Sequence, residues 1–216
     1  MRTLAVIALK GGSGKTTIAT HLALAAHLRG LDVLVADTDP QKSARDVLSS
    51  REAEGPAVVE VTGATLLSAQ LAAQGLKKDL VVIDTAAGAL EDVSEALVLA
   101  DYSVLVVRPT LLDLAGLART VVLVRKLKKP CAVVMNQAPV PREGSEAPVV
   151  RRFLRGLEYM RVPVIPVVVR ARTVYQTALE TGRSAEESAD EAAKAEITAL
   201  WDFVWRDMAM VLGKEP

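Results

Sequence analysis

The sequence has little cysteine, few aromatic residues and no excess of charge of either sign. Among its 216 residues there is one cysteine, 3% are aromatic, and 26 lysines and arginines balance 26 aspartates and glutamates. A single cysteine excludes a disulfide framework within the chain. A net charge of zero gives no overall attraction to nucleic acid, so any such surface must be local.

Long apolar runs and a leader sequence are also missing. No stretch approaches the roughly 20 apolar residues that a membrane-spanning helix requires. The apolar start of the chain is short and leads directly into a glycine-rich stretch, unlike a secretion signal. We therefore expect a cytoplasmic protein.

The chain is rich in aliphatic residues. Half of the residues are hydrophobic, and because aromatics are scarce the core must consist mainly of valine, leucine, isoleucine and alanine. This composition suits a parallel sheet whose strands are buried on both faces. The length predicts one domain, residues 1–216. We expect an α/β fold with a twisted, mainly parallel sheet and helices on both faces.

The most informative stretch is the glycine-rich sequence LKGGSGKTT of residues 9–17. The apolar residues 4–9 before it predict a buried strand, and Ile18, Leu22 and Ala25 after it predict an amphipathic helix. Glycines between a strand and a helix let successive N–H groups turn towards one point, where the helix N-terminus adds partial positive charge. This combination is typical of a phosphate-binding loop.

Each residue of this loop has an expected part in nucleotide binding. The Lys15 ammonium reaches the outer phosphates, and the Thr16 hydroxyl binds Mg²⁺. The remaining contacts are expected from the other loop residues: Gly11, Gly12, Ser13, Gly14 and Thr17. The usual Walker A spacing asks for a glycine where Leu9 stands, so the first position of that pattern is not matched.

A second lysine, Lys10, precedes the glycines. With it, the string Lys-Gly-Gly-Ser-Gly-Lys-Thr-Thr resembles the deviant Walker A motif of the ParA/MinD class of ATPases. The resemblance implies a P-loop fold, ATP and Mg²⁺ as cofactors, and the small type of ParA partition ATPase without an N-terminal helix-turn-helix. It also implies that Lys10 reaches across an ATP-bound homodimer to the partner's nucleotide, as an arginine finger does.

A second predicted strand, residues 32–36, ends in Asp37-Thr38-Asp39-Pro40-Gln41. This sequence resembles the Asp-x-Asp-Pro-Gln box of the ParA family. By that resemblance Asp39 orients the attacking water and Asp37 helps to hold the Mg²⁺ shell. The alternative is that Asp39 caps a helix that begins at about Gln41, and the two roles are compatible.

A third apolar strand, residues 79–83, is followed by Asp84. A carboxylate at this point is typical of a Walker B site, in which Asp84 binds Mg²⁺ directly or through water. Relatives commonly carry proline where Ala86 stands, so we expect a less rigid backbone after Asp84.

The rest of the chain continues to alternate between expected strands and expected helices. Helices are expected at residues 43–52, 66–75 and 111–128 and in a segment that contains Arg151, Arg152 and Arg155, and strands at residues 57–61, 102–107, 131–135 and 162–169. Cys131 is expected in the core, and His21 and His27 are expected to be structural. Asn136 lies at a strand end, where the family resemblance implies contact with adenine; the alternative is a turn residue.

Basic residues gather in the second half of the chain. The candidates for a DNA-facing patch, which would meet phosphates without reading bases, are residues 125–129, Arg151, Arg152, Arg155, Arg170, Arg172 and Arg183. The alternatives are ordinary solvated surface and, for residues 125–129, a charge complement to a helix C-terminus.

The segment 186–212 predicts one or two helices with an apolar stripe: Leu200, Trp201, Val204, Trp205, Met208 and Val211. MinD-like relatives end in an amphipathic membrane helix with a basic polar face. Here the nearby basic residues Arg206 and Lys214 are outnumbered by acidic ones, so we expect the stripe to pack against the sheet and membrane contact to be absent.

The resemblance therefore implies a Mg²⁺-dependent ATPase with weak intrinsic activity, cycling between an ATP-bound homodimer and a dissociated ADP state. It implies that the ATP dimer binds DNA non-specifically on the nucleoid. It also implies that a ParB-like or other cargo-adaptor protein stimulates hydrolysis, in plasmid or chromosome partition or in the positioning of protein clusters.

Three other classes share the deviant loop and serve as alternatives. A MinD-like membrane-cycling ATPase is disfavoured by the weakly basic C-terminal segment. An iron–sulfur reductase subunit needs two cluster cysteines per subunit, and this chain has only Cys131. A biosynthetic amide-forming enzyme, such as a dethiobiotin or cobyrinate synthetase, is disfavoured by the Asp-x-Asp-Pro-Gln box.

Overall fold

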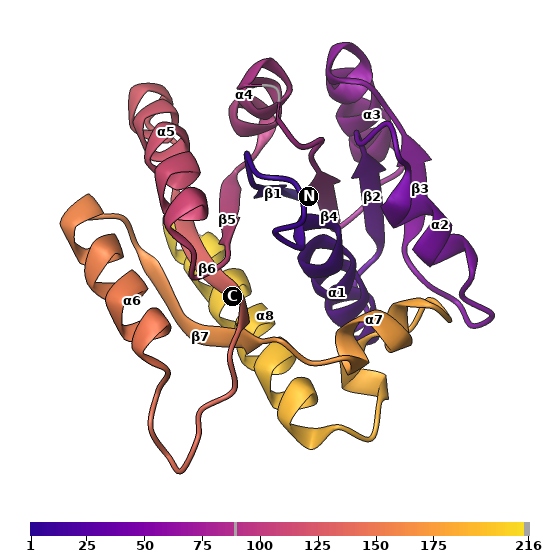
Figure 1. Cartoon of the computed structure of the whole chain (residues 1–216). Helices are drawn as coiled ribbons and strands as arrows, with labels where there is room; N and C mark the ends of the chain where they lie inside the picture. Colours follow the sequence, from indigo (N-terminus) through magenta and orange to yellow (C-terminus); the bar gives the residue numbers. More distant parts are fainter. Residues whose placement is uncertain (89, 214–216) are drawn as a thin grey trace.

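The computed structural model describes residues 1–88 and 90–213, in which strands and helices alternate (Figure 1). The strands are β1 (Arg2–Ile7), β2 (Val33–Asp37), β3 (Ala57–Glu60), β4 (Leu80–Asp84), β5 (Tyr102–Val107), β6 (Cys131–Ala138) and β7 (Val164–Arg170). The helices are α1 (Lys15–Leu28), α2 (Ser43–Ser49), α3 (Gly63–Gly75), α4 (Leu90–Leu99), α5 (Leu111–Leu127), α6 (Pro148–Met160), α7 (Val174–Leu179) and α8 (Glu191–Val211), with a short 3₁₀ helix η1 (Ala185–Glu187).

The strands form one seven-stranded sheet in the order β3-β2-β4-β1-β5-β6-β7, and every neighbouring pair is parallel. Strand β1 is central, and its Val6 pairs with Asp84 of β4. Asp84 in turn pairs with Asp37 of β2. The carboxyl ends of three adjacent strands are therefore level with one another, so the loop after β1 lies beside both carboxylates.

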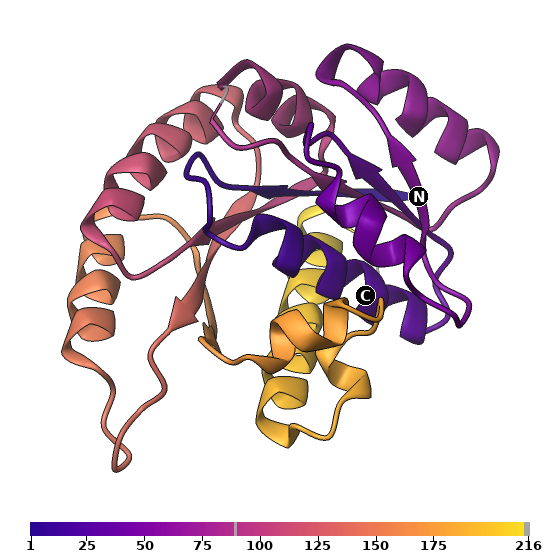
Figure 2. The same ribbon diagram turned by 45° about the vertical axis from the view of Figure 1, so that its right-hand side comes forward.

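Helices cover both faces of the sheet (Figure 2). One apolar core lies under α1, α2, α7 and α8, and the other lies under α3, α4, α5 and α6. Strand β1 contributes to both, with Leu4 and Val6 in the first core and Ala5 and Ile7 in the second. Because both faces of β1 are buried, the apolar residues follow one another without interruption in the run of residues 4–9. A parallel sheet with helices on both faces confirms the expected α/β fold.

Three elements differ from the sequence-based expectation. Helix α4 is not among the predicted helices, and its described buried side chains are only Val93, Ala96 and Leu97. Helix α2 begins at Ser43, as the helix expected over residues 43–52 does, and not at Gln41, because Lys42 adopts a left-handed backbone conformation with φ 54°; it ends at Ser49. Strand β6 runs on to Ala138 and includes Asn136, so Asn136 is not a turn residue.

The apolar stripe of α8 is mostly buried in the core. Leu200, Trp201, Val204 and Met208 are buried in the core beneath α1 and the sheet. The expectation that this stripe packs against the sheet is confirmed for these four residues and, in part, for Trp205, whereas Val211 at the end of the stripe is exposed. In the described residues 1–88 and 90–213, no helix has both the length and the apolarity that crossing a bilayer demands.

A buried histidine fastens α1 to the segment before α8. His21 is fully buried, its Nε2 lies 3.3 Å from the Tyr175 carbonyl oxygen, and its Nδ1 lies 3.3 Å from the Ala185 amide nitrogen. With Nε2–H donating and Nδ1 accepting, both neighbours are satisfied by the neutral ring. Burial lowers the pKa of His21 to about 4, with smaller opposing effects from the Tyr175 carbonyl and Glu186.

This shift predicts an acid-labile fold. The unfolded chain takes up a proton on His21 below pH 6.5 and the folded chain only near pH 4, so stability falls as the pH drops through that window. Urea unfolding of the wild type should lose about 3 kcal/mol more between pH 7 and pH 4 than His21→Gln does. His27→Gln, near the end of the same helix, is the matched control and should retain the wild-type slope; an unchanged slope in His21→Gln would refute the assignment.

Candidate functional site

The loop between β1 and α1 has the geometry that its glycines predict. Gly12 and Gly14 have φ of 74° and 86°, in the left-handed region that side chains disfavour. Helix α1 begins at Lys15, directly after Gly14, and Lys15 is buried. The first N–H groups of α1 have no side-chain cap, so they remain available to an anion.

Strand β6 supports this loop from the other side. Asn136 Nδ2 donates to the Ser13 carbonyl oxygen at 2.8 Å, and Gln137 Nε2 donates to the Gly12 carbonyl oxygen at 3.2 Å. A Cβ on Gly14 would lie 2.2 Å from Asn136 Nδ2, so position 14 is restricted to glycine by space as well as by φ. The structure thus places Asn136 buried against the loop backbone, holding carbonyl groups outward and leaving N–H groups for a ligand.

The two aspartates after β2 are fixed by backbone donors. Asp37 Oδ1 accepts from the Asp39 amide and Oδ2 from the Arg45 amide, both at 3.0 Å. Asp39 Oδ1 accepts from the Gln41 amide at 2.9 Å and closes a turn. Asp39 does not cap α2, whose N-cap is Lys42, so the capping alternative for Asp39 is wrong. Burial raises the pKa of Asp37, against the effect of these amides.

Asp84 is a buried carboxylate that lies beside the Lys15 ammonium and the Thr16 hydroxyl. It is fully buried, and neither of its oxygens has a hydrogen-bond partner among the described residues. Burial raises its pKa to about 7, while the neighbouring Thr16 hydroxyl and the Lys15 ammonium act in the opposite direction. An orphaned buried carboxylate costs free energy unless a cation is supplied, and an incoming metal ion supplies one.

Thr38 connects the loops that follow β2 and β4. Its amide and its hydroxyl donate to the Asp84 carbonyl oxygen at 3.0 and 3.1 Å, and its Oγ1 accepts from the Ala86 amide at 3.1 Å. Ala86 is buried, so a hydrogen bond fixes the backbone where relatives commonly carry proline. Thr38 keeps Asp84 level with Asp37 and Asp39.

These residues suit Mg²⁺ held together with a nucleotide. Mg²⁺ takes oxygen ligands and is usually bound through one or two carboxylates plus phosphates and water. Thr16 and the orphaned Asp84 provide such oxygens beside the loop. In residues 1–88 and 90–213 there is no group of three or more His, Cys, Asp or Glu side chains that could hold a metal ion.

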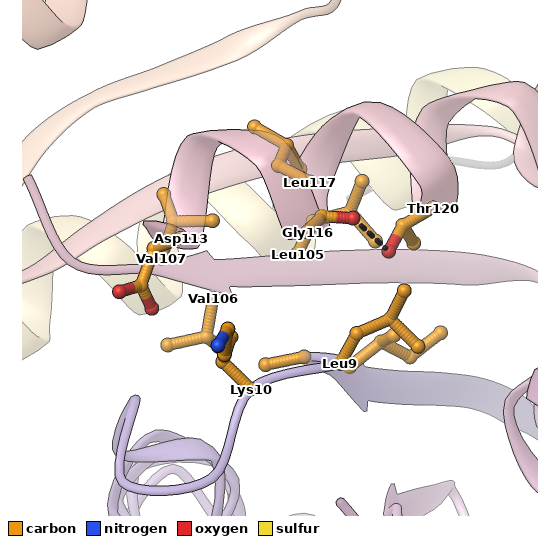
Figure 3. A pocket seen from close by; sticks show the side chains of 11 residues that line it. Leu9, Lys10, Leu105, Val106, Val107, Asp113, Gly116, Leu117 and Thr120 are labelled. Carbon is orange, nitrogen blue, oxygen red and sulfur yellow. Dashed lines mark hydrogen bonds between the residues drawn. The ribbon is translucent and has the colours of Figure 1, made fainter. Parts of the chain in front are cut away.

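Lys10 lies among side chains of β5 and α5 that line one pocket (Figure 3). Its Cγ is 3.6 Å from the position of a Cβ on Gly116, and Lys10 itself is exposed. Lys10, Asp113 and Gly116 line one small pocket beneath the loop. The absence of a side chain at Gly116 therefore leaves room for the lysine stem.

An open hollow of about 330 Å³ adjoins the other end of the loop. It lies between the start of α1 and the segment that follows β7. Its lining comprises Thr17, Asn136, Gln137, Arg170, Ala171, Arg172, Thr173, Tyr175 and Gln176. Two of the three arginines predicted for a DNA patch after β7 are instead paired here, Arg170 with Glu146 and Arg172 with Glu196.

Sequence reasoning missed four residues that shape the site. Thr38 and Gln137 act through hydrogen bonds to backbone atoms, which no motif encodes. Arg108 and Asp113 form an ion pair beside the loop, with Arg108 directly after β5 and Asp113 in the first turn of α5. A polar residue at the carboxyl end of a central strand was the available signal for Arg108.

A sequence model of the CobQ/CobB/MinD/ParA nucleotide-binding domain matches residues 4–184. The chain belongs to this family. Membership of this family implies a nucleotide-binding domain and ATP hydrolysis as the reaction.

Individual relatives agree with this assignment. The chain is 31% identical over 190 residues to the maintenance of carboxysome distribution protein A of Halothiobacillus neapolitanus, covering 84% of this chain and 85% of that one. The fold resembles that of an ATP complex of a Cyanothece McdA variant, with a TM-score of 0.74, 16% identity and coverage of 100% and 98%. It also resembles the Mg-ADP complex of the septum site-determining protein MinD from Pyrococcus horikoshii, with a TM-score of 0.74, 18% identity and coverage of 97% and 98%.

The buried Asp84 carboxylate predicts that Asp84→Asn has opposite effects on the stability of the nucleotide-free protein and on its stabilisation by Mg²⁺. Because the pKa of Asp84 is raised, its ionised form costs stability as the pH rises towards 8, and Asp84→Asn removes that cost. The nucleotide-free variant should therefore be more stable than the wild type by about 1–3 kcal/mol in urea unfolding at pH 8. The same variant should lose the extra stabilisation that Mg²⁺ adds to bound nucleotide.

Asp37→Asn is the control. Asp37 accepts two backbone N–H groups, and an asparagine oxygen replaces only one of these acceptors, so this variant should be less stable than the wild type. A nucleotide-free Asp84→Asn protein that is less stable than the wild type would contradict the assignment of Asp84 as an unpaired metal ligand.

Proposed function

We propose that this protein is a Mg²⁺-dependent ATPase that dimerises around ATP, binds DNA non-specifically in that state and positions a cargo. The observation that carries the proposal is the meeting, at one sheet edge, of the loop of residues 10–17 with Asp37, Asp39 and Asp84. Phosphate-binding N–H groups, a cation at Lys15 and metal-binding oxygens lie together there.

Within one chain, each residue has a chemical part. Lys15 and the N–H groups of the loop bind the phosphates, and Thr16 and Asp84 hold Mg²⁺, with Asp37 orienting its water shell. Mg²⁺ held by Thr16 and Asp84 would supply positive charge to the outer phosphates. Asp39, held by its bond to the Gln41 amide, orients the attacking water.

The nucleotide base occupies the hollow of about 330 Å³ beside Thr17. Asn136 lines it and donates one Nδ2–H to the Ser13 carbonyl oxygen, so its second Nδ2–H and its side-chain oxygen are the groups left for adenine. From this hollow the phosphates extend along the loop towards Lys10. The two ends of the loop thus correspond to the base and the terminal phosphate.

Lys10 acts in the partner chain's site. It is exposed at the outer end of the loop, while Lys15 is buried at the inner end. A cation delivered from a second chain stabilises the charge that develops on the transferred phosphoryl group, so hydrolysis depends on dimerisation.

DNA binding is assigned to the α5–α6 side. Residues 119–161 contain ten lysines and arginines against three glutamates, in a chain with no net charge. The two helices pack closely, with Leu114 Cδ2 only 3.0 Å from the position of a Cβ on Gly156. Arg152 and Arg155 are exposed on α6 and form no ion pair among the described residues. Such a surface meets phosphates without reading sequence.

The cargo follows from the relatives. The Halothiobacillus protein is named for carboxysome distribution, and positioning of a protein cluster is therefore the first candidate, with plasmid or chromosome partition as the second. In either case a cargo-bound adaptor protein stimulates weak intrinsic hydrolysis. A MinD-like membrane cycle is disfavoured because the apolar stripe of α8 is buried, and cluster chemistry is disfavoured because Cys131 is buried in β6.

The proposed trans role of Lys10 predicts complementation between two inactive variants. Lys10→Ala should still bind ATP but should lose most dimer-dependent turnover, and Asp39→Ala should lose turnover in its own site. In a mixed dimer, the Lys10→Ala chain keeps Lys15 and Asp39 and receives Lys10 from its partner, so phosphate release should reappear on mixing. Turnover that stays absent in the mixture, although the two chains form mixed dimers, would rule out the trans role.

The proposed DNA surface predicts a charge-dependent loss. With both Arg152 and Arg155 changed to Glu, DNA affinity in ATP should fall at least about tenfold and the salt dependence should flatten, while DNA-free ATP turnover is unchanged. Arg206→Glu on α8 is the matched control and should bind DNA as the wild type does. Filter binding over a salt series with ATP, ADP and no nucleotide measures this; wild-type binding that ignores the nucleotide would contradict the proposal.

A further inference from the structure

Arg108 brings a further cation to the nucleotide-binding loop. It directly follows β5, the strand that pairs with β1, and Ile7 lies opposite Leu105 in that pairing. The register therefore delivers Arg108 beside the loop that continues β1. Its Nη1 is 3.6 Å from the position of a Cβ on Gly12.

A buried carboxylate holds this guanidinium in place. Arg108 Nε and Nη2 donate to the two oxygens of Asp113 at 3.3 and 3.2 Å. Asp113 is itself buried and is anchored by Thr110, whose hydroxyl donates to Asp113 and whose Oγ1 accepts from the Asp113 amide at 3.1 Å. The bidentate pair fixes the plane of the guanidinium, as such pairs do elsewhere.

One nitrogen of the guanidinium remains uncommitted. Nε and Nη2 are occupied by Asp113, whereas Nη1, the atom that faces Gly12, donates no hydrogen bond among the described residues. The Arg108 side chain is 31% exposed, and Gly12 is exposed as well, so an incoming ligand can reach Nη1.

The position of Arg108 along the loop indicates which phosphate of a bound nucleotide it would contact. The hollow proposed for the base adjoins Thr17, β6 and β7, while Arg108 stands on the β5 side with Lys10. Arg108 pairs with Asp113, and Lys10 lines the same pocket as Asp113, so two cations and one carboxylate stand on this side of the loop. The terminal phosphate of a nucleoside triphosphate is the group of matching charge at that end.

We propose that Arg108 is a specificity-determining residue that donates Nη1–H to the terminal phosphate of ATP in its own chain, with Asp113 as its positioning residue. The proposal rests on the ATPase function proposed above and deepens it. Arg108 makes the site distinguish a triphosphate from a diphosphate before a partner chain arrives. Lys10 then acts from the second chain on a phosphate that is already held.

The test is the ratio of ATP to ADP affinity in the full-length chain. Arg108→Gln should weaken ATP binding about tenfold or more and leave ADP binding unchanged, because charge-assisted bonds to phosphate are among the strongest. Arg108→Lys keeps the charge but cannot bind Asp113 and a phosphate at the same time. Its ratio of ATP to ADP affinity should therefore lie between those of the wild type and Arg108→Gln. Asp113→Asn should reduce the ratio through the loosened guanidinium, and the surface variant Arg206→Gln should retain it.

Each outcome decides a different question. If Arg108→Gln lowers the unfolding temperature but keeps the wild-type ATP-to-ADP ratio, Arg108 is only a structural partner of Asp113 and the proposal is overturned. If Arg108→Gln does not fold, Arg108→Lys with an unchanged ratio overturns it equally. If the wild type binds neither nucleotide, the proposed ATPase function itself fails, which the wild-type measurement shows independently of any variant.

Discussion

The site depends on a buried negative charge that the protein neutralises only in part, since burial outweighs the effects of Lys15 and Thr16 on Asp84. Asp84 lies at the centre of the sheet edge with both oxygens unpartnered among the described residues, while Lys15 and Thr16 stand beside it. The fold keeps this unfavourable arrangement because the apolar cores on both sheet faces hold β1, β2 and β4 in register. A cation bound with nucleotide phosphates turns the same arrangement into a favourable one, so ligand binding and local stability are linked.

The phosphate loop is shaped by neighbours on each side. Asn136 and Gln137 hold its carbonyl groups from β6, and the Arg108–Asp113 pair faces it from β5 and α5. The close approach of Asn136 to Gly14 shows that the glycines serve packing as well as φ. Because these supports come from different strands, the loop geometry is a property of the assembled sheet rather than of the motif, and it is formed before a ligand arrives.

Much of the fold and part of the candidate site could be predicted from the sequence. The strand–loop–helix unit and Asp37 and Asp84 follow from apolar periodicity and from the rule that ligands gather at the carboxyl ends of parallel strands. The pairing of Arg170 and Arg172 with glutamates could not be predicted, because Glu146 and Glu196 are 24 residues away from them in opposite directions. The position of Arg108 beside the loop could not be predicted for a similar reason. It depends on the register between β1 and β5 and on the bond to Asp113, five residues further along the chain.

The most direct test is the equilibrium binding of ATP to the full-length wild-type protein, measured by calorimetry with Mg²⁺ and again with a chelator. The structure predicts saturable binding of one ATP per chain that is markedly weaker without Mg²⁺, because Asp84 then stays unpaired beside the phosphates. Absence of saturable binding, or binding of equal strength with the chelator present, would contradict the assignment of this sheet edge as a Mg-ATP site.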